Sequence, residues 1–161
     1  MSTFLFVWNP SKFSWKKPND LNADLEEDIS TLNQGKKLER RWSCGVIRNA
    51  ISVDDRVFLM MLGKNINGSP LRSKGIVGAG FVTIPPYLDK HYDKPDKTMT
   101  YINIGFEHLL NHETQKILEL EELEKINAVR NFWTPQAAKS ITTEADKLER
   151  RWRDFLPGNS R

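Results

Sequence analysis

The chain opens with an apolar, aromatic and β-branched run, Phe4 to Trp8, that stops at an Asn-Pro pair. Such a run, bounded by residues that break regular structure, predicts a buried strand. Two further apolar runs are Arg56 to Leu62 and Gly75 to Ile84, and the second stops at Pro85-Pro86. Each predicts a strand, and we expect the two to pair. The small residues of the second run indicate that another backbone packs closely on it.

The remaining apolar positions predict three helices and one more strand. The predicted helices cover residues 21–32, 113–125 and 143–155, and the strand covers residues 98–106. Asn19 or Asp20 is the expected N-cap of the first helix. The last helix has the clearest signal, because acidic residues precede basic ones along an apolar stripe. Together these elements predict an α+β domain with a curved or barrel-like sheet and peripheral helices.

Length and composition predict one domain in a reducing compartment. A chain of 161 residues, 39% of them hydrophobic, can bury one core. We place this domain at residues 1–156 and interpret residues 157–161 as the start of a linker to an effector domain. The first apolar run is too short to span a bilayer and lacks a basic segment before it, so we expect no signal peptide and no membrane partner. The single cysteine, Cys44, excludes an internal disulfide and favours the cytoplasm.

Positive charge is concentrated in one part of the chain. Residues 36–74 contain nine Lys/Arg and three Asp/Glu, a surplus of six, whereas the other residues contain 15 and 18, a deficit of three. A concentrated basic segment favours a polyanionic partner, because neutralising phosphates releases counterions. A solvated basic face without a ligand explains the same charge equally well.

Five tryptophans are more than the core of a small domain requires. Trp8, Trp42 and Trp133 each lie beside a predicted loop, whereas Trp15 and Trp152 are more typical of structural positions. An aromatic face can hold a planar base that has left its stack, and such stacking contributes about 1–3 kcal/mol per base. For any one tryptophan taken alone, packing in the core is the more common role.

The sequence offers little catalytic chemistry. His108 and His112 share helical i,i+4 spacing, but the glutamate of a zinc-protease motif is missing after His108. Cys44 has no histidine near it in the sequence, so we interpret it as a small buried apolar residue. No glycine-rich phosphate loop is present. We therefore expect no metal, no cofactor and no enzymatic activity, with a weak nuclease or a nucleotide-hydrolysing protein as the rival hypothesis.

Several segments resemble the EVE domain family, and the resemblance covers almost the whole chain. The segments that match the family are 4–15, Arg41-Trp42-Ser43-Cys44-Gly45, 54–59 and 75–80. The branch of the family fused to HNH nucleases, found in modification-dependent HNH-type or McrBC-like restriction endonucleases, is closest, because Trp133-Thr134-Pro135-Gln136 and 148–152 resemble its ending. Two departures are the apolar pair Met61-Leu62, where this branch has polar residues, and Ala137-Ala138-Lys139, where it has Ser-Ser-Gly.

The resemblance implies a PUA-like fold, related to YTH domains, with a pocket for a modified base. The residues that it places in the pocket are Trp8, Asn9, Trp42, Ser43, Met60, Met61, Leu62, Trp133 and Gln136. The basic residues expected on the nucleic-acid backbone are Lys36, Lys37, Arg40, Arg41, Arg72 and Lys74. Phosphate contacts would position the nucleic acid while the pocket supplies specificity.

The leading hypothesis is a DNA-binding specificity module of a prokaryotic modification-dependent restriction system. It would recognise a flipped-out 5-methylcytosine or 5-hydroxymethylcytosine in double-stranded DNA. A nuclease or NTPase would act on the rest of a longer chain or on a partner subunit. The alternative is recognition of modified RNA, for example 6-methyladenine, because YTH domains use a similar aromatic cage.

Overall fold

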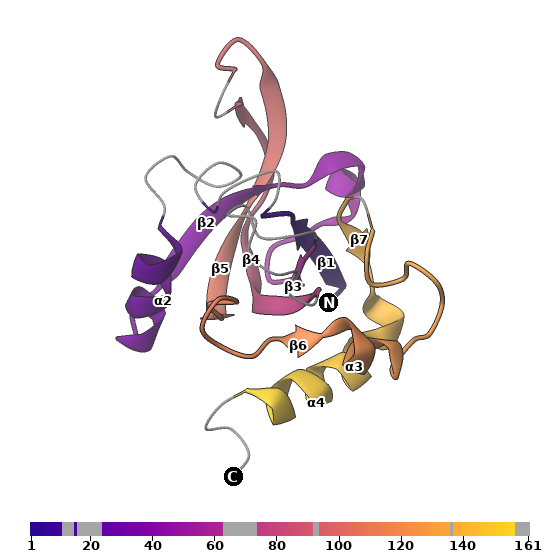
Figure 1. Cartoon of the computed structure of the whole chain (residues 1–161). Helices are drawn as coiled ribbons and strands as arrows, with labels where there is room; N and C mark the ends of the chain where they lie inside the picture. Colours follow the sequence, from indigo (N-terminus) through magenta and orange to yellow (C-terminus); the bar gives the residue numbers. More distant parts are fainter. Residues whose placement is uncertain (11–14, 16–23, 63–73, 92–93, 136, 157–161) are drawn as a thin grey trace.

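The computed structural model describes most of the chain as one curved sheet with helices around it (Figure 1). The described residues are 1–10, 15, 24–62, 74–91, 94–135 and 137–156. Arg72, Gln136 and the predicted linker 157–161 lie outside them. None of the helices within the described ranges is long and apolar enough to cross a membrane.

The sheet has seven strands in the order β2-β5-β4-β3-β1-β7, and β6 pairs with β4 off this path. The strands are β1 (Thr3–Trp8), β2 (Leu38–Ser43), β3 (Arg56–Met61), β4 (Gly75–Lys90), β5 (Thr98–Leu109), β6 (Leu118–Glu119) and β7 (Lys139–Ser140). β1 and β3 are parallel, and the other pairs are antiparallel. The four predicted strands are confirmed, including the pairing of β3 with β4.

The prediction that β4 stops at Pro85-Pro86 is wrong, because the strand continues to Lys90. The pairing with β5 shifts register between Ile84 and Tyr87, where the prolines lie. A proline has no N–H to donate, and a bulge is one of the places in a sheet where the missing donor is tolerated. Beyond this bulge β4 and β5 form the long two-stranded arm at the top of Figure 1.

The predicted close approach to the small residues of β4 is confirmed. A Cβ added at Gly75 would lie 2.5 Å from the carbonyl oxygen of Leu118, and one added at Gly80 would collide with the carbonyl oxygen of Gly105. These two glycines allow β6 and β5 to come close to β4.

The helices are α2 (Leu25–Asn33), α3 (Leu120–Glu124) and α4 (Ala145–Phe155), with short 3-10 turns η1 (Gly45–Ala50) and η2 (Thr142–Glu144). The closing helix is confirmed as α4. The first predicted helix is confirmed from Leu25 on as α2, whose N-cap is Asp24: its carboxylate accepts from the Glu27 N–H at 3.1 Å. Asp24 fits this position because an acidic N-cap satisfies an unpaired helix N–H. The expected N-caps Asn19 and Asp20 lie outside the described residues.

The predicted helix over 113–125 is largely wrong. Only the five residues of α3 are helical, and the two residues before them form β6. β6 pairs with Gly75 and Ile76, the start of β4, where β5 has already ended. The edge of the sheet therefore provides backbone hydrogen bonds that a helix would otherwise have made internally.

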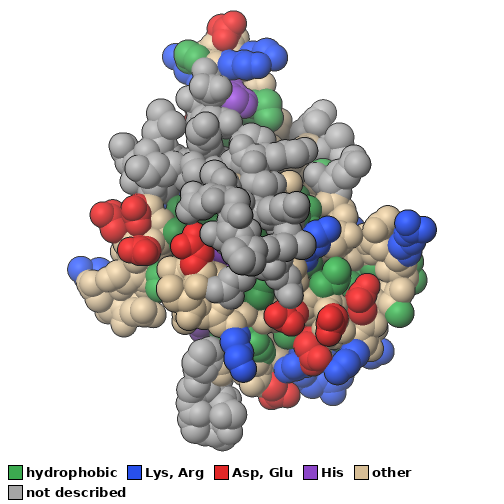
Figure 2. Space-filling view, viewed as in Figure 1, with side chains coloured by type: hydrophobic (Ala, Val, Ile, Leu, Met, Phe, Trp, Pro, Cys, Tyr) green, Lys and Arg blue, Asp and Glu red, His purple; other side chains and the backbone are tan. Residues whose placement is uncertain are grey.

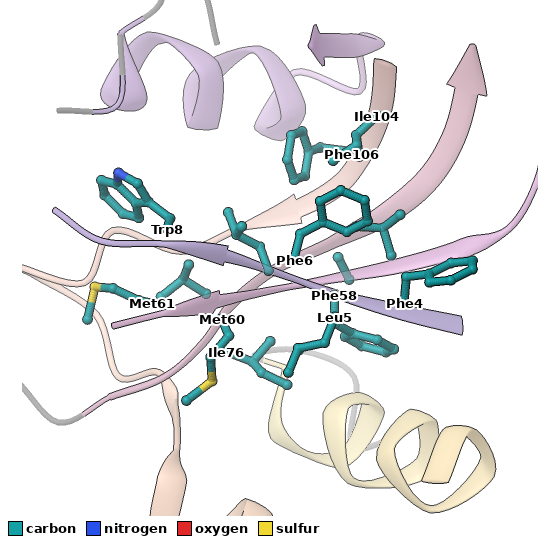
Figure 3. Packing of buried hydrophobic residues seen from close by; sticks show 14 of the residues in the cluster. Phe4, Leu5, Phe6, Trp8, Phe58, Met60, Met61, Ile76, Ile104 and Phe106 are labelled. Carbon is teal, nitrogen blue, oxygen red and sulfur yellow. The ribbon is translucent and has the colours of Figure 1, made fainter. Parts of the chain in front are cut away.

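The core lies on both faces of the central strands. Every side chain of β3 is buried, and so are five of the six in β1. In Figure 3, Phe6 and Trp8 lie on the same side of the central strands as Phe106 on β5, whereas Met60 and Ile76 point toward the side on which α4 lies. Because the sheet curves, its concave face encloses the first group, and α4 covers the other. The concave face is where the candidate site lies.

Candidate functional site

Three indoles meet at the concave face of the sheet, and we call them the tryptophan cluster: Trp8, Trp15 and Trp42. Trp15 lies between the other two. Its ring centroid is 5.2 Å from that of Trp8 at an interplanar angle of 81°, and 5.5 Å from that of Trp42 at 55°. These are edge-to-face and tilted contacts of the kind that aromatic rings prefer. All three indoles are at most 5% exposed.

The cluster joins strands that are far apart in the sheet order. Trp8 ends β1 and Trp42 lies near the end of β2, the edge strand on the opposite side of the sheet. The indole N–H of Trp42 donates to the Val7 carbonyl oxygen at 3.3 Å. This contact bridges the open side of the curved sheet with a side chain, because β1 and β2 share no strand pairing.

A buried carboxylate fixes the central indole. The indole N–H of Trp15 donates to Asp28 Oδ2 at 2.9 Å, and Asp28 on α2 is 2% exposed. Arg40 on β2 binds the same carboxylate through two bonds, Nη2 to Oδ1 at 2.6 Å and Nε to Oδ2 at 3.0 Å. Such a bidentate pair has a defined geometry and compensates the buried negative charge.

Two other rings complete the walls. The Phe106 ring on β5 lies 6.1 Å from Trp15, and the His112 ring lies 5.3 Å from Trp8 at an angle of 80°. His112 is 4% exposed, and its Nε2 lies 3.9 Å from the Glu113 carboxylate. The imidazole brings hydrogen-bonding capacity to a region otherwise lined by apolar rings.

The remaining residues predicted for the pocket along β1, β2 and β3 divide between the two faces. Asn9, Ser43 and Leu62 are half-buried and adjoin the ends of these strands. Met61 pairs with Trp8, so the two side chains point to the same face, whereas Met60 points to the opposite one. The five strand and loop positions therefore cannot all line one pocket, and Met60 lies on the side of Ile76 (Figure 3).

Trp133 lies in a different environment. It is 1% exposed, its indole N–H donates to the Asn127 carbonyl oxygen at 3.0 Å, and its ring contacts Phe132 at 4.9 Å. Lys139 Nζ lies 3.7 Å from the centre of the Phe132 ring, and burial lowers the pKa of this lysine. Ala137 lies close to η1, the turn that follows β2, since a Cβ on Gly45 would be 4.0 Å from the Ala137 Cβ. Gln136 is outside the described residues.

Of the basic residues expected on phosphates, Arg72 is outside the described residues, and the others differ in exposure and in their partners. Lys36 and Lys37, in the turn before β2, are exposed, and so is Lys74 before β4. Arg40 and Arg41 are adjacent in β2 and therefore point to opposite faces. Arg40 binds Asp28, as described above. Arg41 pairs with Asp89 at 2.9 Å and lies 4.2 Å over the Tyr101 ring, so a phosphate would compete with existing partners for both arginines.

The sequence does not indicate that Trp15, Asp28 and His112 lie at the cluster. Trp15 is buried, as its expected structural position implies, and it is also the central ring of the cluster. Asp28 lies in an acidic helical turn, and only its burial distinguishes it from Glu26 and Glu27. The signal that could have identified Asp28 is a helical position between Leu25 and Ile29 that turns inward with the apolar stripe.

Charged side chains and a groove mark the surface of the molecule. On the face in Figure 2, acidic side chains gather over α2, and both charge signs gather over α3 and α4. A groove of about 630 Å³ runs between α2, the end of β5 and Leu156. Among the described residues, none of those predicted for the pocket lines this groove. In the part of the chain that the structure describes, no three His, Cys, Asp or Glu side chains are grouped as metal ligands.

Comparison with known proteins finds the same fold in several solved structures. Human THYN1 in complex with 5-methylcytosine-containing DNA has a TM-score of 0.54 at 16% identity, covering 98% of this chain and 100% of that one. The DUF55 domain of human thymocyte nuclear protein 1 has a TM-score of 0.53 at 13% identity, covering 96% and 100%. A protein from Pseudomonas syringae has a TM-score of 0.52 at 20% identity, covering 93% and 99%.

At these identities the likeness establishes the fold. The α+β, PUA-like architecture expected from the resemblance to EVE domains is therefore confirmed, as a curved sheet that does not close into a barrel. A comparison with protein-family models gives no match. A comparison with curated proteins also gives none.

Proposed function

We propose that this chain is a DNA-binding domain that recognises 5-methylcytosine or 5-hydroxymethylcytosine after the base has been extruded from the duplex. The observation that carries the proposal is the tryptophan cluster at the converging ends of β1 and β2. It lies in a fold shared with THYN1, a protein whose structure contains 5-methylcytosine DNA. Aromatic faces can hold a planar base whatever its identity.

Energetics determine what else the site needs. Extruding a base costs a few kcal/mol, and stacking returns about 1–3 kcal/mol. All three indoles are buried against each other, so a base must replace part of these ring contacts. Burial of one methyl group adds only about 0.8 kcal/mol. Discrimination therefore requires polar contacts. The His112 ring lies against Trp8, and Asn9 and Ser43 directly follow Trp8 and Trp42 in the chain.

The domain would supply specificity to an effector. We infer that a nuclease or NTPase, on a longer chain or a partner subunit, cuts or translocates DNA marked by this domain, as in a modification-dependent restriction system. The purified chain should then bind modified duplexes and leave them intact in Mg²⁺. Cleavage that persists through repurification and disappears when one carboxylate is replaced would favour the enzyme hypothesis.

The test is a binding assay with matched nucleic acids. Fluorescence anisotropy would compare duplexes containing cytosine, 5-methylcytosine, 5-hydroxymethylcytosine or 6-methyladenine, together with 6-methyladenine RNA. The variant is Trp42→Phe, which keeps an aromatic ring but loses the bond to the Val7 carbonyl. The control is Trp152→Phe, because Trp152, on α4, is equally buried but packs with Phe58 on β3 and with Phe155 on its own helix.

We expect the wild-type protein to prefer one modified-cytosine duplex, Trp42→Phe to lose that preference and Trp152→Phe to keep it. A preference for the modified RNA would mean that the domain recognises a modified base in RNA and not in DNA. Equal weak binding to every oligonucleotide, unchanged in both variants, would contradict a base-recognition function.

A further inference from the structure

Asp28 stands out because it touches the tryptophan cluster without being part of it. It is 2% exposed, on a helix whose neighbouring acidic residues Glu26 and Glu27 are exposed. Both of its carboxylate oxygens have short contacts, and the three donors among the described residues belong to Trp15 and Arg40. Burying a carboxylate this deeply is costly, so its position must be compensated by these bonds.

The contact acts on the ring that controls the geometry of the cluster. Trp15 touches Trp8 on one side and Trp42 on the other. Trp8 and Trp42 are held by β1 and β2, but Trp15 lies outside regular structure. An indole has a single N–H, so the bond to Asp28 Oδ2 fixes the direction of its polar edge. Arg40 in turn fixes the plane of the carboxylate through its bidentate contact.

We propose that Asp28 is a positioning residue that orients Trp15 and thereby sets the selectivity of the tryptophan cluster for a modified base. The inference rests on the proposed function. It assigns Arg40 a structural role: its guanidinium orients Asp28 and does not contact phosphate. A site that discriminates by one methyl or hydroxymethyl group depends on a precise spacing of its walls, because burial of that group contributes little by itself.

The experiment compares four variants. Asp28→Asn keeps the size of the side chain but cannot accept both the indole and the guanidinium fork. Trp15→Phe keeps the ring and removes the N–H, and the third variant combines both changes. The control is Glu107→Gln, which removes the charge of a carboxylate that binds the buried Arg56 at 2.7 Å on a different part of the sheet.

Two readouts separate positioning from simple stabilisation. The first is the ratio of affinities for 5-methylcytosine and cytosine duplexes. We expect Asp28→Asn to reduce this ratio by about tenfold, the effect of losing one charge-assisted bond. Trp15→Phe should reduce it similarly, the combined variant should reduce it no further, and Glu107→Gln should leave it unchanged. The second readout is the near-ultraviolet circular dichroism of the tryptophans, which requires no DNA and should change in Asp28→Asn but not in Glu107→Gln.

The outcomes are distinct. An Asp28→Asn protein with wild-type selectivity and wild-type near-ultraviolet dichroism, even if less stable, would overturn the positioning role. If Asp28→Asn does not fold, Trp15→Phe alone decides, and unchanged selectivity in that variant would also overturn it. If the wild-type protein prefers no modified duplex, the proposed function fails. The dichroism then decides whether Asp28 orients Trp15, and the selectivity role is overturned with the function.

Discussion

At the scale of single residues, Arg56 shows how a buried charge is accommodated outside the candidate site. It begins β3, is 8% exposed, and binds the carboxylates of Glu107 and Glu149 at 2.7 Å each. Its guanidinium also lies 4.7 Å from the Phe81 ring. Glu149 belongs to α4, so this one side chain connects β3 to the closing helix.

Replacement of this arginine should be costly. We expect Arg56→Met to lower the free energy of unfolding by about 2–4 kcal/mol, because removing one partner of a buried ion pair leaves the others unpaired. Urea unfolding monitored by tryptophan fluorescence measures this loss. Lys147→Met, on the exposed face of α4, is the control and should change stability little. A loss no larger than that of the control would mean that the ion pairs of Arg56 add nothing to the net free energy of unfolding.

Replacement of Lys139 should raise the stability of the fold, by an amount that depends on pH. Burial lowers its pKa, so the unfolded chain binds a proton more tightly than the folded one. The resulting penalty is fully present below the folded pKa and is relieved as the pH rises toward the ordinary lysine value. We expect Lys139→Met to be slightly more stable than wild type at pH 7 and equal to it at pH values where lysine is neutral in both states. Thermal unfolding across this range measures the difference, and a gap that widens at high pH would contradict it.

At the scale of elements, helices and strands are predicted correctly where the sequence of the segment itself is enough to determine its structure. β1 and β3 are continuous apolar runs, and α4 carries a complete amphipathic stripe, so all three are confirmed. The region before α3 was predicted incorrectly because Leu118 pairs with the start of β4, a partner more than 40 positions away. Likewise, the continuation of β4 beyond its two prolines depends on a bulge against β5 that no local pattern indicates.

The candidate site follows the same division. Trp8 and Trp42 could be selected from the sequence, because the resemblance to EVE domains marks both. The place of Trp15 between them depends on Asp28 and Arg40, which lie 13 and 25 positions away and meet only through the packing of α2 on β2. Met60 and Met61 could have been separated in advance, since adjacent residues of a strand point to opposite faces.

The contact between α3 and α4 depends on Glu122. Hydrogen bonds from Lys125 and Arg151 lower the pKa of this carboxylate, at 2.8 Å and 2.6 Å. A lowered folded-state pKa stabilises the fold above the ordinary carboxylate pKa, and this stabilisation is lost as the pH falls through the folded value. We expect Glu122→Gln to lower the melting temperature at pH 7, less so at high salt, and not at all once the carboxylate is protonated. The neighbouring Glu121→Gln is the control; an equal effect there would contradict a specific α3–α4 contact.

At the scale of the whole molecule, nucleic-acid binding should separate into a salt-dependent part and a selective part. Lys36 and Lys37 are exposed and adjacent, on the turn that leads into the strand carrying Trp42. If both contact phosphates, the double change Lys36→Gln and Lys37→Gln should reduce the slope of log affinity against log salt by about 2. Affinity should fall equally for modified and unmodified duplexes.

Anisotropy titrations at several salt concentrations measure this slope. The matched control is Lys147→Gln on α4, which should leave it unchanged. A loss confined to the modified duplex would place these lysines at the base instead of the backbone, and an unchanged slope would remove them from the interface.

Whether this domain holds an extruded modified base can be measured by placing 2-aminopurine beside 5-methylcytosine in a duplex and adding the protein. Extrusion of the methylated base unstacks its neighbour, so we expect a saturating rise in 2-aminopurine fluorescence. The rise should be absent with the unmodified duplex and reduced by Trp42→Phe. Tight binding of the methylated duplex with no change in fluorescence would show that the base stays in the helix and would contradict recognition by extrusion.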